Sequence, residues 1–192
     1  MWVQIISIVI GGLITDNIIF SQTLGICPFL GVSKKLDSAV GMGLAVTFVI
    51  VLSSIVCYYL YMLLELLALE YLQTILFILI IAALVQLLDI VLKRVSPSLY
   101  TSLGVYLALI TTNCAVLGTA NNVVAQGYGL LETVVSALSV GLGFTLALIL
   151  MAGVREKVAR SPIPKPFLGF PIALVIAGLM AMAFYGFQGL SF

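Results

Sequence analysis

The sequence predicts an all-α membrane protein in which six transmembrane helices form two inverted three-helix repeats. Composition is the first reason, because 63% of the 192 residues are hydrophobic and only 8% are charged. A soluble domain carries about 25% charged residues, so a chain this apolar needs lipid around it. The second reason is a set of apolar segments long enough to cross a bilayer. The third is a cysteine motif that occurs once in each half.

The six apolar segments are expected to be helices, because a span needs about 20 apolar residues and lipid offers the backbone no other hydrogen-bond partner. Strands of a barrel would instead alternate apolar and polar residues with period two. The segments are Trp2 to about Leu24, Ala39 to Leu64, Tyr71 to Leu92, Leu99 to Gly118, Leu130 to Gly153 and Phe167 to Phe187. We expect a single membrane domain over residues 1–192, with one repeat over about 1–95 and the other over about 96–192.

Composition also excludes several classes of function. The net charge of +1 argues against a nucleic-acid partner, which requires a basic face. The chain has no histidine, so imidazole bases and histidine-ligated metals are excluded from it. Three cysteines are too few for a disulfide framework. The first apolar segment lacks both a basic start and a cleavage site, so we expect a retained span rather than a signal peptide.

The loops between the segments predict the orientation. All eight basic residues lie in the loops after segments one, three and five, and the positive-inside rule places those loops in the cytoplasm. They are Lys34, Lys35, Lys93, Arg94, Arg155, Lys157, Arg160 and Lys165. The loops with Glu65 and Glu70, and with Asn121, Asn122 and Glu132, contain no basic residue. These loops and both termini are therefore expected outside.

The cysteine motif runs from Thr23 to Ser33 and again from Thr111 to Ala120, with Cys27 corresponding to Cys114. Because each half has three spans, the two copies are expected in opposite orientations, as in known inverted repeats with broken helices near the midplane. The correspondence extends to Leu30 with Leu117, Gly31 with Gly118, and Gly41-Met42-Gly43 with Gly141-Leu142-Gly143.

Helices one and four are expected to break at these motifs. In the first copy, Pro28 removes a backbone donor, and Gly25 and Gly31 lower the cost of leaving helical geometry. A straight helix from residue 2 would carry Cys27 roughly 37 Å along its axis, beyond a hydrocarbon core of about 30 Å. In the second copy, the side chains of Thr111, Thr112 and Asn113 compete for backbone hydrogen bonds, and Gly118 ends the apolar run.

The paired cysteines suggest half of a metal site. An iron–sulfur cluster usually takes four thiolates, so the remaining ligands would come from another chain, most simply a homologue with the same two motifs. Thiolates also favour soft metals over Mg²⁺ or Ca²⁺. A free cysteine in an apolar helix is otherwise a small hydrophobic residue, which is the interpretation for Cys57. The same inert role stays open for Cys27 and Cys114 at this point.

Three stretches resemble the RnfA/NqrE family of membrane proteins, namely Leu24–Lys35, Leu109–Gly118 and Gly178–Phe184. The sequence of Cys27–Gly31 is more similar to the RnfA branch than to the NqrE branch. The first branch comes from the bacterial Rnf complex and the second from the sodium-pumping NADH:quinone reductase. The resemblance implies that the chain pairs with its homologue RnfE, of opposite orientation, around a pseudo-two-fold axis. A [2Fe-2S] cluster then lies between them in the membrane, with Cys27 and Cys114 as two of its ligands.

The resemblance further implies a bacterial cytoplasmic (inner) membrane complex that passes electrons between ferredoxin and NAD and couples this to Na⁺ or H⁺ movement. The B, C, D and G components of the Rnf complex are the other partners, and no complete active site is expected in this chain alone. Backbone N–H groups freed at the breaks, at Gly25 and Asn113, are expected to donate to sulfur. The residues expected around the cluster are Gly25, Ile26, Pro28, Gly31, Thr112, Asn113 and Gly118.

Two further questions stay open on the sequence. Asp16 and Asn17 lie inside the first apolar segment, where ionisable residues are functional candidates, so ion handling stands beside a simpler role in capping a helix end. Inverted three-span repeats with broken helices also describe small-solute secondary transporters, which is the alternative function. A scaffold with inert cysteines is the third.

Overall fold

The computed structural model is all-helical in the part of the chain that it describes, residues 2–33, 36–67, 70–95, 109–162, 164–167 and 169–187. Its α-helices are α1 (Trp2–Ile10), α2 (Ile26–Val32), α3 (Leu36–Leu66), α4 (Gln73–Val95), α6 (Cys114–Ala125), α7 (Leu130–Ala159) and α8 (Phe170–Tyr185). The π-helix η1 (Gly11–Thr15) continues α1, and the 3₁₀ turns η2 (Glu70–Leu72) and η3 (Lys165–Phe167) precede α4 and α8.

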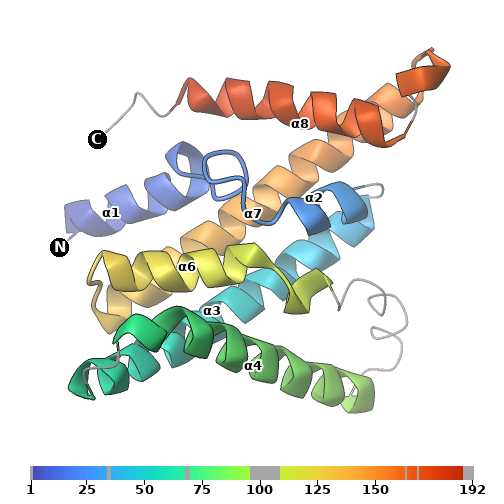
Figure 1. The fold of residues 1–192 in the computed structure, drawn as a ribbon. Helices are drawn as coiled ribbons and strands as arrows, with labels where there is room; N and C mark the ends of the chain where they lie inside the picture. Colours follow the sequence, from blue (N-terminus) through green and yellow to red (C-terminus); the bar gives the residue numbers. More distant parts are fainter. Residues whose placement is uncertain are drawn as a thin grey trace.

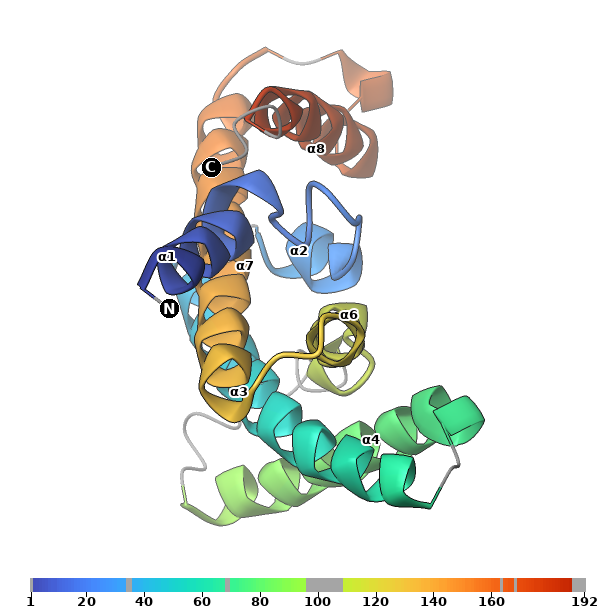
Figure 2. The same cartoon turned by 90° about the vertical axis from the view of Figure 1, so that its left-hand side faces the viewer.

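Two long helices, α3 and α7, form the centre of the molecule (Figure 1). The shorter helices α2 and α6 lie on one side of this pair, between α8 and α4 (Figure 2). Length and hydropathy allow α3, α7 and residues 73–90 of α4 to cross a membrane, and two shorter apolar helices cover residues Val3–Thr15 and Phe170–Tyr185. The described part of the chain is therefore that of a multi-pass membrane protein.

The contact between α3 and α7 is reciprocal. A Cβ atom on Gly43 would lie 2.6 Å from the Thr145 side chain, and a Cβ on Gly141 would lie 2.6 Å from the Thr47 side chain. Each threonine donates to the carbonyl of the glycine four residues earlier, at 2.7 and 2.9 Å, and the two Oγ1 atoms are 3.3 Å apart. Small residues thus let two antiparallel backbones approach closely.

The glycines in this contact are not an aligned pair of the repeat. The sequence aligned Gly41-Met42-Gly43 with Gly141-Leu142-Gly143, whereas Gly43 and Gly141 are the two that face a threonine of the other helix. Gly41 has no atom within 4 Å of a Cβ built on it, and a Cβ on Gly143 would meet the carbonyl oxygen of Gly12. The internal correspondence of the two halves therefore stays a prediction.

The second, third and sixth predicted spans agree with α3, α4 and α8 to within three residues. Helix α7 continues six residues beyond the fifth span, and Lys93, Arg94, Arg155 and Lys157 are helical rather than in loops. The first and fourth spans differ more. The first helix ends with η1 at Thr15 rather than near Leu24, and residues 16–25 form turns before α2. The break was expected, yet it begins earlier. Of the fourth span, residues 99–108 lie outside the described ranges, and the remainder is interrupted at Thr112–Asn113.

The end of the fourth span was placed wrongly. Helix α6 continues through Gly118 to Ala125, so Gly118 does not end it, and Asn121 and Asn122 are helical rather than in a loop. Gly118 is needed because a Cβ there would collide with Leu24 Cδ1. Glu132, also expected in the loop, lies in the first turn of α7, where its carboxylate accepts from Gly129 N at 3.1 Å.

Candidate functional site

The two cysteine-bearing helices begin at the same point. Gly25 is the N-cap of α2, and Asn113 is the N-cap of α6, whose first residue is Cys114. The backbone N–H of Gly25 donates to Sγ of Cys114 at 3.0 Å. The expected donation from a freed backbone N–H to sulfur is thus present at Gly25, whereas the N–H of Asn113 donates to the carbonyl of Ile110 at 3.2 Å. The N-terminal ends of α2 and α6 meet there, although 89 residues separate the donor from the acceptor.

Only glycine fits at position 25, for two independent reasons. Its φ of 81° lies in the left-handed region, which glycine adopts without a steric penalty. A Cβ at this position would also lie 2.7 Å from Cε2 of Phe144 and 3.2 Å from Cβ of Ala115. Phe144, on α7, is fully buried and covers the inner side of the junction.

Asn113 shapes the start of α6. Its Oδ1 accepts from the backbone N–H of Ala115 at 3.1 Å, which satisfies one of the free donors of the first turn. The side chain is 5% exposed, and its Nδ2 is buried with no hydrogen-bond partner within the described part of the chain. An unsatisfied buried donor costs about 1–3 kcal/mol.

The three cysteines differ in exposure. Cys27 and Cys114 are exposed on the isolated chain, whereas Cys57 is buried in the core. Both exposed thiols lie in the first turn of a helix, where the positive end of the helix dipole stabilises negative charge on a thiolate or a bound anionic group. No three Cys, Asp or Glu side chains gather into a metal site anywhere in the described ranges. A metal bound here would therefore take further ligands from elsewhere.

The junction lies at mid-height of the molecule. Phe144, which touches Gly25, is the central residue of α7, and a rise of 1.5 Å per residue puts it roughly 21 Å from either end. The reciprocal contact of Thr145 with Thr47 is one residue further along. If α7 spans the membrane symmetrically, the junction lies near the midplane.

The far end of α2 is fixed by a charged side chain. Arg155, on α7, donates from Nη1 to the carbonyl of Leu30 at 2.8 Å and to Oγ of Ser33 at 2.9 Å. Free carbonyls at a helix C-terminus carry partial negative charge, and a guanidinium there both bonds to them and offsets that charge. Arg155 thus holds the short helix that carries Cys27.

Known proteins match this chain over nearly its whole length. A family described as "Rnf-Nqr subunit, membrane protein" matches residues 5–191. The chain belongs to the Rnf-Nqr family. It is 56% identical over 187 residues to the A component of the Na(+)-translocating ferredoxin:NAD(+) oxidoreductase complex of Acetobacterium woodii, covering 97% of both chains. The expected resemblance is confirmed.

Other members of the family give the same result. Identity is 50% over 188 residues to the A component of the ion-translocating oxidoreductase complex of Syntrophotalea carbinolica. It is 47% over 190 residues to the component of the same description from Azotobacter vinelandii, and 97% of each chain is covered in both comparisons. The Rnf-Nqr match thus includes both cysteine motifs and all the described helices.

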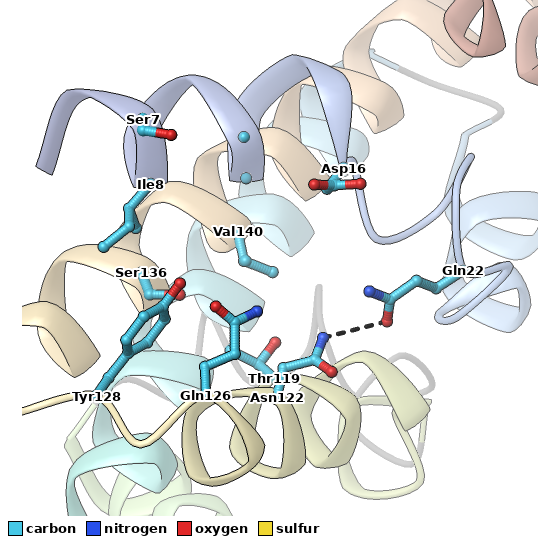
Figure 3. Close-up of a pocket in the computed structure, with 12 residues that line it drawn as sticks. Ser7, Ile8, Asp16, Gln22, Thr119, Asn122, Gln126, Tyr128, Ser136 and Val140 are labelled. Carbon is cyan, nitrogen blue, oxygen red and sulfur yellow. Dashed lines mark hydrogen bonds between the residues drawn. The ribbon is translucent and has the colours of Figure 1, made fainter. Parts of the chain in front are cut away.

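Asp16 and Asn17 of this Rnf-Nqr protein have different roles. Asn17 is buried, and its Nδ2 donates to the carbonyls of Gly143 at 2.8 Å and Leu13 at 3.3 Å, while its Oδ1 accepts from Ile19 N at 3.2 Å. These bonds tie the end of the first helix to α7, so Asn17 has the capping role. Asp16 is exposed and lines a cavity of about 460 Å³ (Figure 3).

The other residues expected around the thiols vary in how closely they approach. Gly25 contacts sulfur and Asn113 directly precedes Cys114, whereas a Cβ on Gly31 would meet only Leu109 at an ordinary 3.7 Å. Pro28 is buried, Ile26 is half-buried and Thr112 is exposed. The sequence did not reveal Phe144 or the capping role of Arg155. Arg155 was visible only as a basic residue near a predicted span end.

Proposed function

We propose that this chain is the A component of an ion-translocating ferredoxin:NAD⁺ oxidoreductase complex of the Rnf type. In it, Cys27 and Cys114 supply two ligands of an intramembrane [2Fe-2S] cluster that is shared with the homologous E component. Support for the complex comes from the relatives, each matched over 97% of its length. One is described as the A component of a Na(+)-translocating ferredoxin:NAD(+) oxidoreductase complex, and two as the A component of an ion-translocating oxidoreductase complex. This chain contributes an electron-transfer step of the enzyme and not a complete active site.

The junction of α2 and α6 carries the proposal for the cluster. Two exposed thiols stand beside the meeting point of two positive helix ends, and one sulfur already accepts a backbone hydrogen bond. The side chain of Asn113 caps α6 and so fixes the first turn that carries Cys114. These features fit a cluster, which is anionic and whose potential depends on burial and on hydrogen bonds to its sulfurs.

A partner is needed because the cluster usually takes four thiolates and this chain offers two at the junction. The simplest partner is a homologue that presents the same junction from the opposite side. The reciprocal contact of Gly43 and Gly141 with the facing threonines supports a pseudo-two-fold axis inside the chain itself. We therefore keep the division into inverted repeats of about 1–95 and 96–192, with the axis passing near Thr47 and Thr145.

The chain's own residues position and insulate the group. When bound, the cluster accepts and donates single electrons at mid-membrane, so that a core of about 30 Å is crossed in two shorter steps. Gly25 and Asn113 orient the sulfur of Cys114 through the first turn of α6. Phe144 closes the inner side of the junction and excludes water. Sites for ferredoxin and NAD belong to other components, for which B, C, D and G of the Rnf complex are proposed.

The orientation follows from the basic end of α7. Arg155, Lys157 and Arg160 lie in its last turns, and the positive-inside rule places that end in the cytoplasm. The turn between α6 and α7 and both termini are then external. Lys34 and Lys35, which also support this orientation, lie outside the described residues. The membrane proposed is the bacterial cytoplasmic (inner) membrane.

The test is cluster content in the purified complex. Cys27→Ser and Cys114→Ser should each abolish the [2Fe-2S] signal in electron paramagnetic resonance and lower iron and acid-labile sulfide by one cluster per complex. Cys57→Ser is the matched control, because it removes a buried thiol away from the junction, and it should leave the signal intact. If the [2Fe-2S] signal were unchanged in both Cys27→Ser and Cys114→Ser, the two cysteines would not be cluster ligands. The scaffold or the transporter would then be the better explanation of the chain's function.

A further inference from the structure

A polar cavity lies beside the junction and has no role in the electron-transfer site. It occupies about 460 Å³ between α1–η1 and α6, with α7 behind it (Figure 3). Asp16 lies on one side, and the amides of Gln22, Asn122 and Gln126 lie across from it. The space is large enough for a small ion together with several water molecules, since each water takes about 30 Å³.

The lining has the chemistry of a cation site. Asp16 is the one charged side chain among the described residues that line it, and the other polar side chains are amides and hydroxyls. Carboxylate, amide and hydroxyl oxygens are ligands of hard metal cations, which thiolates are not. Asn122 donates from Nδ2 to Oε1 of Gln22 at 3.3 Å. That bond orients the amide and leaves its Oδ1 as an acceptor.

Helix ends add to the negative potential. The first helix ends with η1 at Asp16, and α6 ends at Gln126, so two helix C-termini border the cavity. Each contributes partial negative charge, and half-helix C-termini coordinate Na⁺ in membrane transporters. A π-helix such as η1 is itself frequent at functional sites. Burial raises the pKa of Tyr128 beside the cavity, and the negative charges of Glu132 and Asp16 add to that rise.

The cavity reaches from the loop before α7 toward the middle of the molecule. Tyr128 lies in that loop, two residues before α7 begins. At the other end, Asp16 is followed by Asn17, which is bonded to the carbonyl of Gly143, one residue before Phe144 of the junction. Asp16 therefore lies within about one helical turn of the height at which α2 and α6 meet.

We infer that this cavity binds a hydrated monovalent metal cation, with the Asp16 carboxylate as the anionic ligand and the amides of Asn122 and Gln126 facing it across the cavity. The bound cation keeps part of its water shell, because the cavity exceeds the size of a bare ion. Binding itself depends only on these residues. Its use as a loading step for ion translocation rests on the proposed function.

The test uses the purified complex with NaCl as the probe, at constant ionic strength held with choline chloride. The Na⁺ concentration for half-maximal ferredoxin:NAD⁺ activity and the equilibrium binding of ²²Na⁺ are both measured. Asp16→Asn should weaken both by about tenfold or more, because a unit charge beside the ion is lost. Asn122→Ala should weaken them by about threefold, as expected for the loss of one neutral ligand.

Asp37→Asn is the control, since Asp37 is an exposed carboxylate in the first turn of α3, away from the cavity. It should leave both Na⁺ measurements unchanged. The inference is overturned if Asp16→Asn and Asn122→Ala match this control, or if the wild-type complex shows no dependence on Na⁺. The [2Fe-2S] signal, recorded on the same samples, separates these outcomes from a failure of the proposed cluster, which Asp16→Asn should leave intact.

Discussion

Helices α2 and α6 begin alike and end differently. Both start at the central junction, both carry a cysteine in the first turn, and both point their C-termini away from it. The seven-residue α2 ends against Arg155, which donates to the carbonyl of Leu30 and to the hydroxyl of Ser33. The twelve-residue α6 ends at Gln126, which borders the polar cavity with Asp16.

The difference separates two tasks. Because α2 and α6 meet by their N-termini, their positive ends face the anionic cluster that we propose and their negative ends face outward. At the C-terminus of α2, the guanidinium of Arg155 offsets the negative potential. At the C-terminus of α6, the negative potential remains available to the cation that we propose in the cavity. The symmetric part of the molecule thus suits electron transfer, and the asymmetric part suits a cation.

The largest effect is expected from a substitution at the junction where α2 and α6 begin. Gly25→Ala should abolish cluster incorporation, because its Cβ would meet Phe144 and Ala115 and its φ is 81°. Gly127→Ala is the matched control, since Gly127 also has a positive φ, 62°, but no atom within 4 Å of its Cβ. It should keep the cluster and lose only about 1–2 kcal/mol of stability. Iron analysis that gave equal cluster content in the two variants would refute the close junction.

The second effect tests whether the two halves are equivalent. Gly43→Ala and Gly141→Ala should each destabilise the protein by about 1–3 kcal/mol through overpacking against the facing threonine. Thr145→Ala should partly rescue the first and Thr47→Ala the second. Gly41→Ala, with open space around it, should be neutral or slightly stabilising. Thermal denaturation of the detergent-solubilised complex measures this, and unequal costs without reciprocal rescue would contradict the pseudo-two-fold contact.

The third effect concerns the end of α2 alone. Arg155→Gln should cost about 1–2 kcal/mol through loss of two partly buried hydrogen bonds. It should also broaden the cluster's paramagnetic signal, because the helix that carries Cys27 loses its anchor. Arg160→Gln removes an exposed pair with Glu156 and should cost less than about 0.5 kcal/mol. Identical spectra for the two variants would show that Arg155 does not hold α2.

The smallest effect concerns the start of α6. Asn113→Ala should cost about 1 kcal/mol by removing the N-cap, whereas Asn113→Asp keeps the capping oxygen. The aspartate replaces the unpartnered Nδ2 donor with a negative charge, so the reduction potential of the cluster should fall in that variant. Redox titration is the measurement, and a potential equal to wild type would place Nδ2 away from the cluster.

Sequence reasoning reached the breaks and the paired thiols because both have local causes. Gly25 and Asn113 each favour non-helical backbone by themselves, and the cysteines repeat beside them. Pro28, expected at the break, lies instead in the first turn of α2, where its missing N–H costs no helical bond. It placed the ends of the broken helices wrongly, since Gly118 was taken as a stop. In the structure Gly118 makes room for Leu24, a residue from the other motif.

The contacts that complete the site were beyond sequence reasoning because they join distant segments. The bond from Gly25 to Cys114, the covering by Phe144 and the anchoring of α2 by Arg155 depend on how α7 lies against α2 and α6. Periodicity could not give the register between α3 and α7, since both helices are apolar on most sides. The lining of the cavity likewise combines residues from α1, η1, α6, α7 and the adjoining loops. Asp16 is the one lining residue for which the sequence suggested ion handling.

An anomalous difference map at the iron absorption edge, from crystals of the assembled complex, tests the central claim most directly. The account predicts two iron atoms where the N-termini of α2 and α6 meet, at the height of Phe144, bonded to Sγ of Cys27 and Cys114 and to two thiolates of a partner protein. Iron absent from this junction, with both thiols turned toward lipid, would contradict it.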